Sequence, residues 1–297
     1  MGRIVVIGGS GFLGSYVCDE LARRGHHVVV ADKVRSIHGP SHLKFAQCDI
    51  LQQDSLDPII DGASAVYNFA GQADLDDSVG RRRETIELNI LGNLNVLEAC
   101  VKAKVSRFIF ASSAYAISNK GGFYGISKQA SERIVREYAD RFGLEFTIIR
   151  YGSLYGSRAD SRNGIHRLLH QAMTTGKIVH KGDGEEIREY IHAVDAARLS
   201  VDIMENAVYA NGHVVLTGVE RLKHKDILQM ISEITNGKLE IIYTNEEREG
   251  HYKITPYSLQ PELGTKLIAN PFIDLGQGLM DCMIHILRDI EKDGSST

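Results

Sequence analysis

Short apolar runs alternate with amphipathic stretches through the first half of the chain. Stretches with apolar residues three and four apart predict helices over Phe12–Arg24, Thr85–Lys102 and Lys128–Phe142. Between them, runs rich in branched side chains predict strands over Ile4–Ile7, Val28–Ala31, Leu43–Ala46, Ala65–Ala70, Phe108–Ala111 and Phe146–Ile149. Repeated alternation of strand and helix is typical of an α/β protein with a doubly wound parallel sheet covered by helices on both faces.

The pattern is less regular after Arg150 and predicts a smaller C-terminal α/β region. Residues 156–164 (GSRADSRNG) have the composition of a loop. Apolar runs then predict strands over Ile178–His180, Glu189–His192 and Val214–Thr217. Helical spacing predicts helices over Ile165–Thr175, Val194–Met204, Lys225–Asn236 and Leu275–Ile290.

Composition and charge indicate an ordinary globular protein. Of the 297 residues, 43% are hydrophobic and 24% charged, and the formal net charge of −4 gives no electrostatic case for a nucleic acid as main partner. The N-terminal apolar stretch is too short for a signal peptide, and no run is long enough to predict a membrane span. The cysteines are widely spaced and predict buried free thiols: Cys18, Cys48, Cys100 and Cys282. We therefore expect a cytoplasmic protein with no membrane partner.

A glycine-rich turn connects the first predicted strand to the first predicted helix. Its sequence GGSGFLG covers Gly8, Gly9, Ser10, Gly11, Phe12, Leu13 and Gly14. Glycines allow the backbone to approach a ligand closely, and a helix N-terminus presents N–H groups to a pyrophosphate. The GxxGxxG spacing differs from the GxGxxG fingerprint, so the turn by itself is weak evidence for a Rossmann-type dinucleotide site.

An acidic residue at the end of the second predicted strand strengthens this interpretation. Asp32 follows Gly14 by eighteen positions, where a carboxylate can accept hydrogen bonds from the ribose hydroxyls of adenosine. The same charge repels the 2′-phosphate of NADP, so the sequence favours NAD. Lys33 and Arg35 lie close by in the sequence and would weaken that preference.

A serine, a tyrosine and a lysine follow in an order that predicts redox chemistry on an alcohol. Ser113 ends a predicted strand, and Tyr124 and Lys128, four positions apart, lie on one face of the next helix. A phenol is a poor base at neutral pH, but a nearby ammonium and an oxidised nicotinamide favour the phenolate. We expect Tyr124 to accept the hydroxyl proton and Ser113 to orient the oxygen.

The ordered set of motifs resembles the extended short-chain dehydrogenases, and within them the NAD-dependent nucleotide-sugar epimerases and dehydratases. Besides the turn and Asp32, the motifs are CDI at 48–50, NFAG at 68–71, ELNILGNLNVLEAC at 87–100, FASSA at 110–114, YGISK at 124–128, RYGSLYG at 150–156 and GDGEEIREYIHAVDAA at 182–197. The C-terminal stretch HYKITPYSLQPELGTKL, residues 251–267, is similar to bacterial polysaccharide-sugar enzymes that include GDP-heptose 4-dehydrogenases.

The resemblance implies further site residues. Asp49 and Ile50 would flank the adenine, and Ala70 and Gly71 would pass beside the cofactor ribose and phosphates. Asn89 would lie near the active site, either as a structural amide or as a relay partner, and Tyr151 would lie near the nicotinamide. Lys128 would anchor the nicotinamide ribose. Arg188 would clamp the substrate diphosphate, for which a planar guanidinium is well suited; its alternative is a solvated charge at a strand edge.

Three departures from the family pattern affect the expected reaction. Ala114, Tyr115 and Ala116 stand where the family's dehydratases carry an Asp-Glu pair, which disfavours 4,6-dehydration. Gly152 and Ser153 stand where many members have asparagine, so Ser153 either replaces one diphosphate contact or that contact is lost. Only eleven positions separate Ser113 from Tyr124, and this short connection predicts a more open cleft.

The resemblance implies oxidation at C4 of a UDP-, GDP- or dTDP-linked sugar through a 4-keto sugar, in surface-polysaccharide sugar biosynthesis. A 4-epimerase returns the hydride to the other face, whereas a 4-dehydrogenase releases the keto sugar, and the sequence does not separate the two. A nonenzymatic NAD-binding regulator on the same fold is the alternative of a different class, against which the Tyr–Lys pair argues. His166 and His170 are four apart, but no third metal ligand is evident, so we expect no metal site.

The resemblance also implies a domain division and a homodimer. Residues 1–155, with a return segment at about 189–217, would form the NAD-binding Rossmann domain. Residues 156–188 and 218–297 would form the substrate-binding region. A four-helix bundle built from the helices at 85–102 and 128–142 would join two copies.

Overall fold

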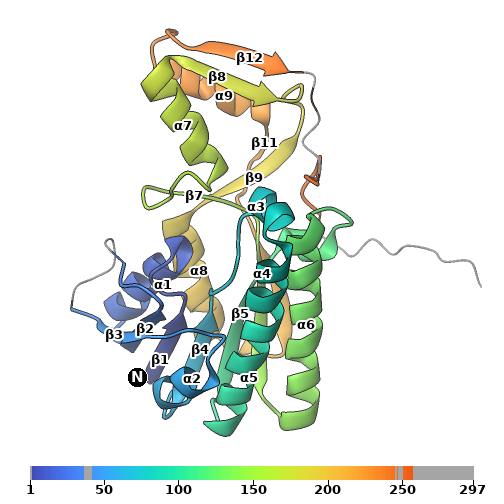
Figure 1. Ribbon diagram of the computed structural model, residues 1–297. Helices are drawn as coiled ribbons and strands as arrows, with labels where there is room; N and C mark the ends of the chain where they lie inside the picture. Colours follow the sequence, from blue (N-terminus) through green and yellow to red (C-terminus); the bar gives the residue numbers. More distant parts are fainter. Residues whose placement is uncertain (1, 37–41, 245, 247–249, 257–297) are drawn as a thin grey trace, which may run out of the picture. The chain divides into compact units, whose positions relative to one another are not determined.

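The computed structural model describes residues 2–36, 42–244, 246 and 250–256 of the chain. Its centre is a seven-stranded, wholly parallel sheet in the order β10-β6-β5-β4-β1-β2-β3 (Figure 1). The strands are β1 (Arg3–Ile7), β2 (His27–Asp32), β3 (Lys44–Gln47), β4 (Ala65–Asn68), β5 (Arg107–Ser113), β6 (Glu145–Tyr151) and β10 (Gly212–Leu216). The predicted doubly wound Rossmann-type sheet is confirmed.

The chain reverses its direction of travel across the sheet between β1 and β4. The strands β1, β2 and β3 extend one way, and β4, β5, β6 and β10 extend the other. In such a sheet the carboxyl ends of β1 and β4 flank a crevice in which ligands bind. The order of the strands therefore places a site beyond Ile7 and Asn68, where the glycine turn begins.

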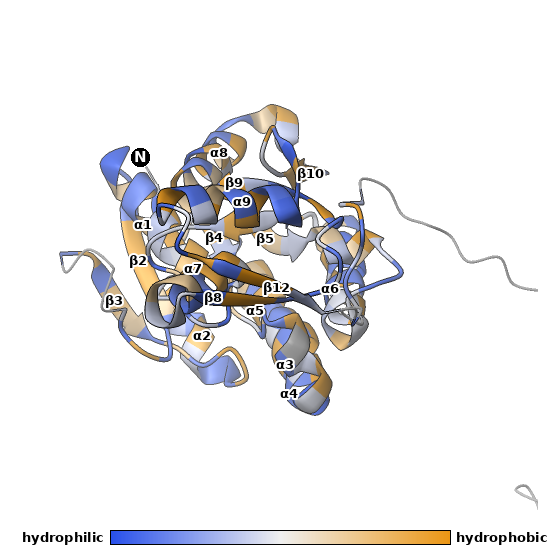
Figure 2. Cartoon of the chain, turned by 90° about the horizontal axis from the view of Figure 1, so that it is seen from above, coloured by the Kyte–Doolittle hydropathy of each residue, from blue (hydrophilic) through white to orange (hydrophobic). Residues whose placement is uncertain are grey.

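Alternation of side chains along the strands gives the sheet two apolar faces. In β1, Ile4 and Val6 belong to one buried cluster, and Val5 and Ile7 belong to the other. The first cluster packs against helices α1 (Phe12–Arg23) and α8 (Ala193–Glu205). The second packs against α2 (Gln53–Ile60), α5 (Gly92–Lys102) and α6 (Gly122–Phe142). The outer helices show both hydrophilic and hydrophobic segments in Figure 2, as expected where one helix face meets the core.

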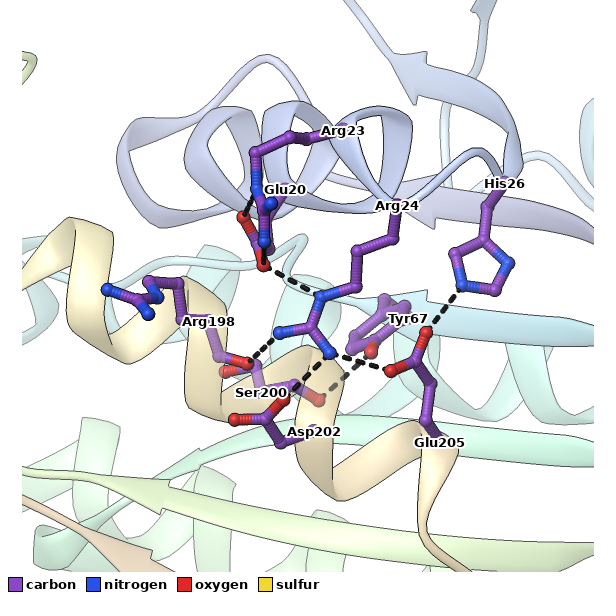
Figure 3. Close-up of polar contacts among 9 residues, drawn as sticks. All are labelled: Glu20, Arg23, Arg24, His26, Tyr67, Arg198, Ser200, Asp202 and Glu205. Atoms are coloured by element: carbon purple, nitrogen blue, oxygen red, sulfur yellow. Dashed lines mark hydrogen bonds and ion pairs between the residues drawn. The ribbon is translucent and has the colours of Figure 1, made fainter.

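A polar network on the surface ties α1 to α8. Arg24, just after α1, contacts Glu20, Asp202 and Glu205, and it donates to the backbone oxygen of Arg198 (Figure 3). In the core beneath, the Tyr67 hydroxyl donates to the Ser200 carbonyl at 3.1 Å. This network joins the first helix to one about 180 residues later, so it helps to hold the two helices together on one face of the sheet.

The predicted helix at 85–102 is interrupted. The structure has α3 (Leu75–Gly80) and α4 (Arg82–Ile86), and then a π-helical turn over Glu87–Leu91 before α5. At this turn the Ser131 hydroxyl of α6 donates to the backbone oxygen of Asn89 at 2.7 Å. A π turn offsets the register of a helix and is often found at functional sites.

The remaining strands form two small sheets. In the first, β9 (Ile187–His192) pairs in parallel with β7 (Ser153–Tyr155) and antiparallel with β11 (Arg221–Lys223). In the second, β8 (Lys177–Lys181) pairs in parallel with β12 (Glu240–Thr244). A separate apolar cluster joins β8 to two helices through Leu168, Ala172, Ile178, Leu228 and Ile231. These helices are α7 (Gly164–Thr175) and α9 (His224–Ile234); 3₁₀ turns occupy Ala114–Ile117 and Ala207–Tyr209.

Several predictions concern the C-terminal part. The helices and strands predicted between residues 165 and 236 are confirmed within a few residues, whereas β7, β11 and β12 were not predicted. The helix predicted over Leu275–Ile290 lies outside the described residues. The proposed domain boundaries stay a prediction. Cys18, Cys48 and Cys100 are buried free thiols, as predicted, and Cys282 lies outside the described residues.

Candidate active site

A cleft of about 450 Å³ opens at the carboxyl ends of the central strands. Its wall brings together residues of the glycine turn, β5, α6, β6 and the small sheets. The predicted site residues that line it are Gly8, Gly11, Phe12, Leu13, Gly14, Gly71, Ser113, Tyr124, Lys128, Tyr151, Ser153 and Arg188. Asp32, Lys33, Asp49, Ile50, Ala70 and Asn89 are not part of this wall. The cleft thus joins the predicted phosphate turn to the predicted catalytic side chains.

The glycine turn is so closely packed that its backbone, and not its side chains, forms this part of the cleft wall. A Cβ on Gly8, which has φ +74°, would lie 2.5 Å from the Ala70 amide nitrogen, and one on Gly14 would lie 2.3 Å from the Gly8 oxygen. Helix α1 starts directly after Gly11, and within the described chain no side chain caps it. Its first-turn N–H groups therefore face the cleft with the positive end of the helix dipole. This arrangement suits a pyrophosphate.

Asp32 is held at the end of β2 beside this turn. Its Oδ2 accepts a hydrogen bond from the Ser10 amide at 3.0 Å, and its Oδ1 accepts one from the Lys33 amide at 2.7 Å. The Lys33 Nζ lies 3.2 Å from Oδ2 of Asp49, the acidic residue predicted to flank the adenine. Lys33 is therefore paired with Asp49. Asp32 therefore lies next to the turn, and its Lys33 neighbour does not neutralise it.

Asn89 is buried and its amide is used within the protein. Its Oδ1 accepts from the Gln72 amide at 2.7 Å, and its Nδ2 donates to the Gln72 oxygen and to Ser127 Oγ. A Cβ on Gly71 would lie 2.4 Å from Asn89 Oδ1, so the glycine is required for this approach. These contacts favour the structural interpretation of Asn89: it fixes the loop after β4 against α6.

Ile50 and Ala70 are placed by close backbone packing. A Cβ on Gly92 would lie 2.5 Å from Ile50 Cδ1, so the side chain rests against α5. The Ala70 amide donates to Asn68 Oδ1 at 3.1 Å, and Asn68 in turn donates to Asn93. Both residues follow strands of the sheet at the end where the cleft opens.

Ser113 and Tyr124 interact across the cleft. Strand alternation separates the two serines that end β5: the Ser112 hydroxyl donates to Glu132 at 2.6 Å, whereas Ser113 is hydrogen-bonded to the Tyr124 phenol. Burial raises the pKa of the Tyr124 phenol, and the hydrogen bond with Ser113 acts in the opposite direction. The chain alone therefore keeps this phenol protonated.

Lys128 is buried beside Tyr124, with its Nζ 6.0 Å from the centre of that ring. The Nζ donates to the Ala111 carbonyl at 2.9 Å. Burial lowers the pKa of Lys128 from 10.5 to about 8, and the Glu132 carboxylate opposes this change. At neutral pH the lysine is thus charged, but the charge is poorly solvated and available to a ligand.

Tyr151 is held by α8. Its hydroxyl is 2.7 Å from Ser200 Oγ, and its ring lies 6.2 Å from that of Phe69. Burial raises the pKa of this phenol well above its ordinary value, with the Ser200 hydrogen bond opposing it. Tyr151 therefore shapes the cleft wall and is not suited to exchanging protons.

Arg188 is buried on β9 and lies against an aromatic ring. Its guanidinium carbon is 4.4 Å from the centre of the Tyr252 ring, and its Nη1 donates to the backbone oxygens of Ile187 and Lys253. This placement contradicts the alternative of a solvated strand-edge charge. Ser153, on the neighbouring strand β7, is half-buried and also lines the cleft.

Two sets of polar side chains at or near the cleft were not predicted from the sequence. Arg150 and Glu132 form a buried ion pair with an Nη2–Oε2 distance of 2.6 Å, one helical turn beyond Lys128. Tyr115 and His251 form the second set, at the cleft wall. The first had a sequence signal, since Arg150 is a charge inside an apolar strand; the second joins positions 136 apart and had none.

The remaining predictions concern metal binding and membrane-spanning helices. The rings of His166 and His170 lie 6.1 Å apart, and no group of three potential metal-ligating side chains occurs among the described residues. Within the same residues, no helix has the length and apolar character needed to cross a membrane.

Comparison with known proteins identifies the family. The model of the NAD dependent epimerase/dehydratase family matches residues 4–218. A UDP-N-acetyl-alpha-D-glucosaminuronate decarboxylase from Bacillus cytotoxicus is 27% identical over 98% of this chain and 99% of its own. A putative UDP-glucose 4-epimerase from Methanocaldococcus jannaschii is 25% identical over 93% and 95%.

A solved structure agrees with these relatives. The crystal structure of UDP-glucose 4-epimerase from Thermotoga maritima with UDP-glucose is 26% identical, with a TM-score of 0.78 over 93% of this chain and 96% of that one. The family match covers well over half of the chain and includes the turn, the Ser–Tyr–Lys set and most of the residues that line the cleft. This chain belongs to the NAD-dependent epimerase/dehydratase family.

Proposed function

We propose that the protein oxidises C4 of a nucleoside-diphosphate sugar to a 4-keto sugar, with NAD as cofactor, and acts as a 4-epimerase or a 4-dehydrogenase in the biosynthesis of a surface-polysaccharide sugar. One observation carries the proposal: Ser113, Tyr124 and Lys128 meet on the wall of a single cleft whose far end is the glycine turn. A sugar hydroxyl between Ser113 and Tyr124 would present its carbon toward the cofactor side of the cleft.

The protein side chains handle the proton. Tyr124 accepts the proton of the sugar hydroxyl, and Ser113 orients its oxygen by a hydrogen bond. Burial keeps the phenol protonated in the chain alone, although Lys128 beside it is charged below about pH 8. The positive charge of an oxidised nicotinamide, added to that of Lys128, would favour the phenolate and so make Tyr124 a base. Bound NAD would supply the acceptor for the hydride of the sugar carbon and the source for its return.

Each part of NAD would be bound by a group of matching chemistry. The first turn of α1 would hold the pyrophosphate, Asp32 the adenosine ribose, and Lys128 the nicotinamide ribose. Further positions are carried over from the family. Lys33, Asp49, Ile50, Ala70 and Gly71 would lie beside the adenosine and the phosphates, Tyr151 would lie near the nicotinamide, and Asn89 would lie near the active site. Asn89 acts here as a positioning residue, because its amide is spent on Gln72 and Ser127.

Arg188 and Ser153 would bind the substrate diphosphate. The guanidinium is buried at the cleft wall, and a planar fork matches paired phosphate oxygens. The names of the relatives favour a UDP-sugar; a GDP- or dTDP-sugar, including a GDP-heptose, remains to be tested. No carboxylate follows Ser113 at Ala114–Ala116 in the sequence, which argues against 4,6-dehydration.

Decarboxylation is a second candidate, favoured by the Bacillus cytotoxicus relative. If the sugar carried a carboxylate on C5, oxidation at C4 would place it β to a ketone. Carbon dioxide would then leave, and the electrons of the bond between C5 and the carboxylate carbon would form an enolate. The enolate would be protonated at C5, and the hydride would return to C4. The same Ser113–Tyr124–Lys128 set would serve that reaction.

The test identifies the cofactor first and the outcome second. Denatured protein should release NAD, and the native protein is then incubated with UDP-, GDP- and dTDP-sugars while absorbance at the NADH band is followed. Lasting NADH signals a dehydrogenase; an isomerised sugar without net NADH signals an epimerase; carbon dioxide from a sugar acid signals a decarboxylase. Absence of turnover across the panel despite bound NAD would contradict the proposal and favour a regulatory NAD-binding protein.

Association into a homodimer and a cytoplasmic location remain predictions. Exposed apolar side chains on the helices expected to form the dimer, Leu91 in the π turn and Ile126 and Phe142 in α6, support the first. Sedimentation of the purified protein as a monomer would contradict it.

A further inference from the structure

A phenol and an imidazole lie together on the cleft wall beside the proposed catalytic set. The hydroxyl of Tyr115 is 3.0 Å from Nδ1 of His251, and both residues line the cleft. The ring of Tyr115 is 6.3 Å from that of Tyr124 and meets it edge-on at 71°. The pair is thus next to Tyr124 but distinct from the Ser113–Tyr124–Lys128 set.

Several contacts fix the pair in this place. The Tyr115 amide donates to Ser113 Oγ at 3.3 Å, so the serine proposed to orient the C4 oxygen also holds the backbone of Tyr115. On the other side, the Tyr252 ring lies 4.4 Å from that of Tyr115. The Gly121 amide donates to the Gly250 oxygen at 2.7 Å, which binds the segment that carries His251 to the start of α6.

The backbone at Gly121 leaves room for the ring of Tyr115. Gly121 has φ +99°, and a Cβ there would lie 2.8 Å from Cδ1 of Tyr115. Any other residue would be strained in that conformation and would collide with the ring. The loop before α6 is therefore shaped around the Tyr115 side chain.

The proposed oxidation produces a keto sugar on which a second acid–base group can act. When C4 becomes a ketone, the hydrogens on its neighbouring carbons become acidic, because loss of such a proton gives an enolate. Tyr124 cannot remove that proton, since it already carries the one taken from the C4 hydroxyl. Instead, its hydroxyl and that of Ser113 can hydrogen-bond the enolate oxygen.

We propose that Tyr115 and His251 form a second acid–base pair that removes and returns a proton on a carbon bonded to the oxidised C4. The Tyr115 oxygen takes the carbon-bound proton while its own proton passes to His251 Nδ1. The electrons of the C–H bond form the C=C bond of the enolate, and those of the C=O bond move onto its oxygen. The reverse transfer returns a proton from the pair to the same face of the carbon.

This inference rests on the proposed function, since it needs the 4-keto sugar. Its test is turnover in D₂O by the NAD-loaded protein, followed by borohydride reduction, return to H₂O and mass spectrometry of the sugar. Hydride returned from the cofactor does not exchange with solvent, so carbon-bound deuterium reports proton exchange next to C4. We expect one deuterium per sugar after many turnovers, at C3 or C5 by NMR.

Variants assign the exchange to the pair. Tyr115→Phe keeps the ring that packs on Tyr124 and Tyr252 and removes the hydroxyl; His251→Gln is the second variant. The measured quantity is deuterium per hydride transfer, which should fall at least tenfold in both and stay at the wild-type value in Tyr209→Phe, whose hydroxyl lies outside the cleft wall. Incubation of the keto sugar without protein gives the spontaneous exchange to be subtracted.

The outcomes separate the two proposals. Hydride transfer without carbon-bound deuterium above the spontaneous level would overturn the acid–base pair and leave the proposed oxidation standing. Equal exchange in wild type, Tyr115→Phe and His251→Gln would also overturn it. Absence of any NADH or keto sugar would instead contradict the proposed function itself.

Discussion

Lys128 on α6 donates a hydrogen bond from its Nζ to the backbone carbonyl oxygen of Ala111 on β5, at 2.9 Å. The bond anchors the ammonium at the end of the strand that leads to Ser113. Because one of its three donors is fixed in this way, the remaining donors point along a set direction. The hydrogen bond thus joins the carboxyl end of β5 to α6, the helix that carries the proposed base Tyr124.

The buried Lys128 makes stability depend on pH. Its pKa falls from 10.5 to about 8 on folding, so between these values the unfolded chain binds more protons than the folded one. Its contribution is therefore unfavourable below about pH 8 and is relieved as pH rises toward 10.5, by about 3 kcal/mol. Urea unfolding of nucleotide-free protein should show this rise in the wild type relative to Lys128→Met. A constant difference between the two across that range would contradict it.

The Glu132–Arg150 pair should be strongly coupled. Both side chains are buried, and Glu132 also accepts from Ser112. Glu132→Gln leaves an unpaired buried guanidinium and should lower the free energy of unfolding by about 3 kcal/mol or more. The double variant with Arg150→Met should recover a large part of this loss in urea unfolding. Additive losses would mean that the two side chains act independently.

The sequence predicts the central sheet well because its signals are local. The apolar runs of β1, β4 and β5 are bounded by glycine, serine or charged residues, and each strand lies within three residues of its prediction. The π turn at Glu87–Leu91 could not be predicted in this way. It depends on hydrogen bonds from Asn89 and Ser131, which join a helix to residues about 40 positions away.

The residues of the site also divide into those with a local sequence signal and those that only tertiary structure brings together. Tyr124 and Lys128 were found because helical spacing alone puts them on one face. Arg188 required the family resemblance, since a single arginine in a strand has no diagnostic spacing. Its stacking on Tyr252 and the Tyr115–His251 contact depend on tertiary structure, because they join residues 64 and 136 positions apart.

Tyr124→Phe should abolish most of the turnover. Removal of a general base that lies in the correct position lowers the rate by about 10²- to 10⁴-fold. Because the ring remains, the cleft and the content of bound NAD should be preserved. Tyr138→Phe is the matched control, since Tyr138 lies on the same helix but does not line the cleft. Full turnover of Tyr124→Phe would rule out the proposed proton acceptor.

The stability that the surface network between α1 and α8 contributes should depend on Arg24 and hardly at all on Arg23. Arg24 bonds two carboxylates of α8 and the Arg198 oxygen, whereas Arg23 is exposed and contacts Glu20 (Figure 3). Arg24→Met should lower the free energy of unfolding by about 1 kcal/mol, and high salt should reduce the effect. Arg23→Met should change it much less; equal effects would show that the bridge to α8 adds nothing.

Asp32 should set the choice between NAD and NADP. A carboxylate that accepts hydrogen bonds from the ribose contributes about 1.5–3 kcal/mol, so Asp32→Ala should weaken NAD binding by about tenfold or more. Asp32→Asn keeps an acceptor but removes the charge, and should narrow the gap between NAD and NADP chiefly by improving NADP binding. Calorimetric titration of both nucleotides checks this, with Asp57→Asn, on α2 and paired with Lys102, as control. If Asp32→Asn left the ratio of the two dissociation constants unchanged, the charge of Asp32 would not be what excludes the 2′-phosphate, and Lys33, already paired with Asp49, would have to be tested next.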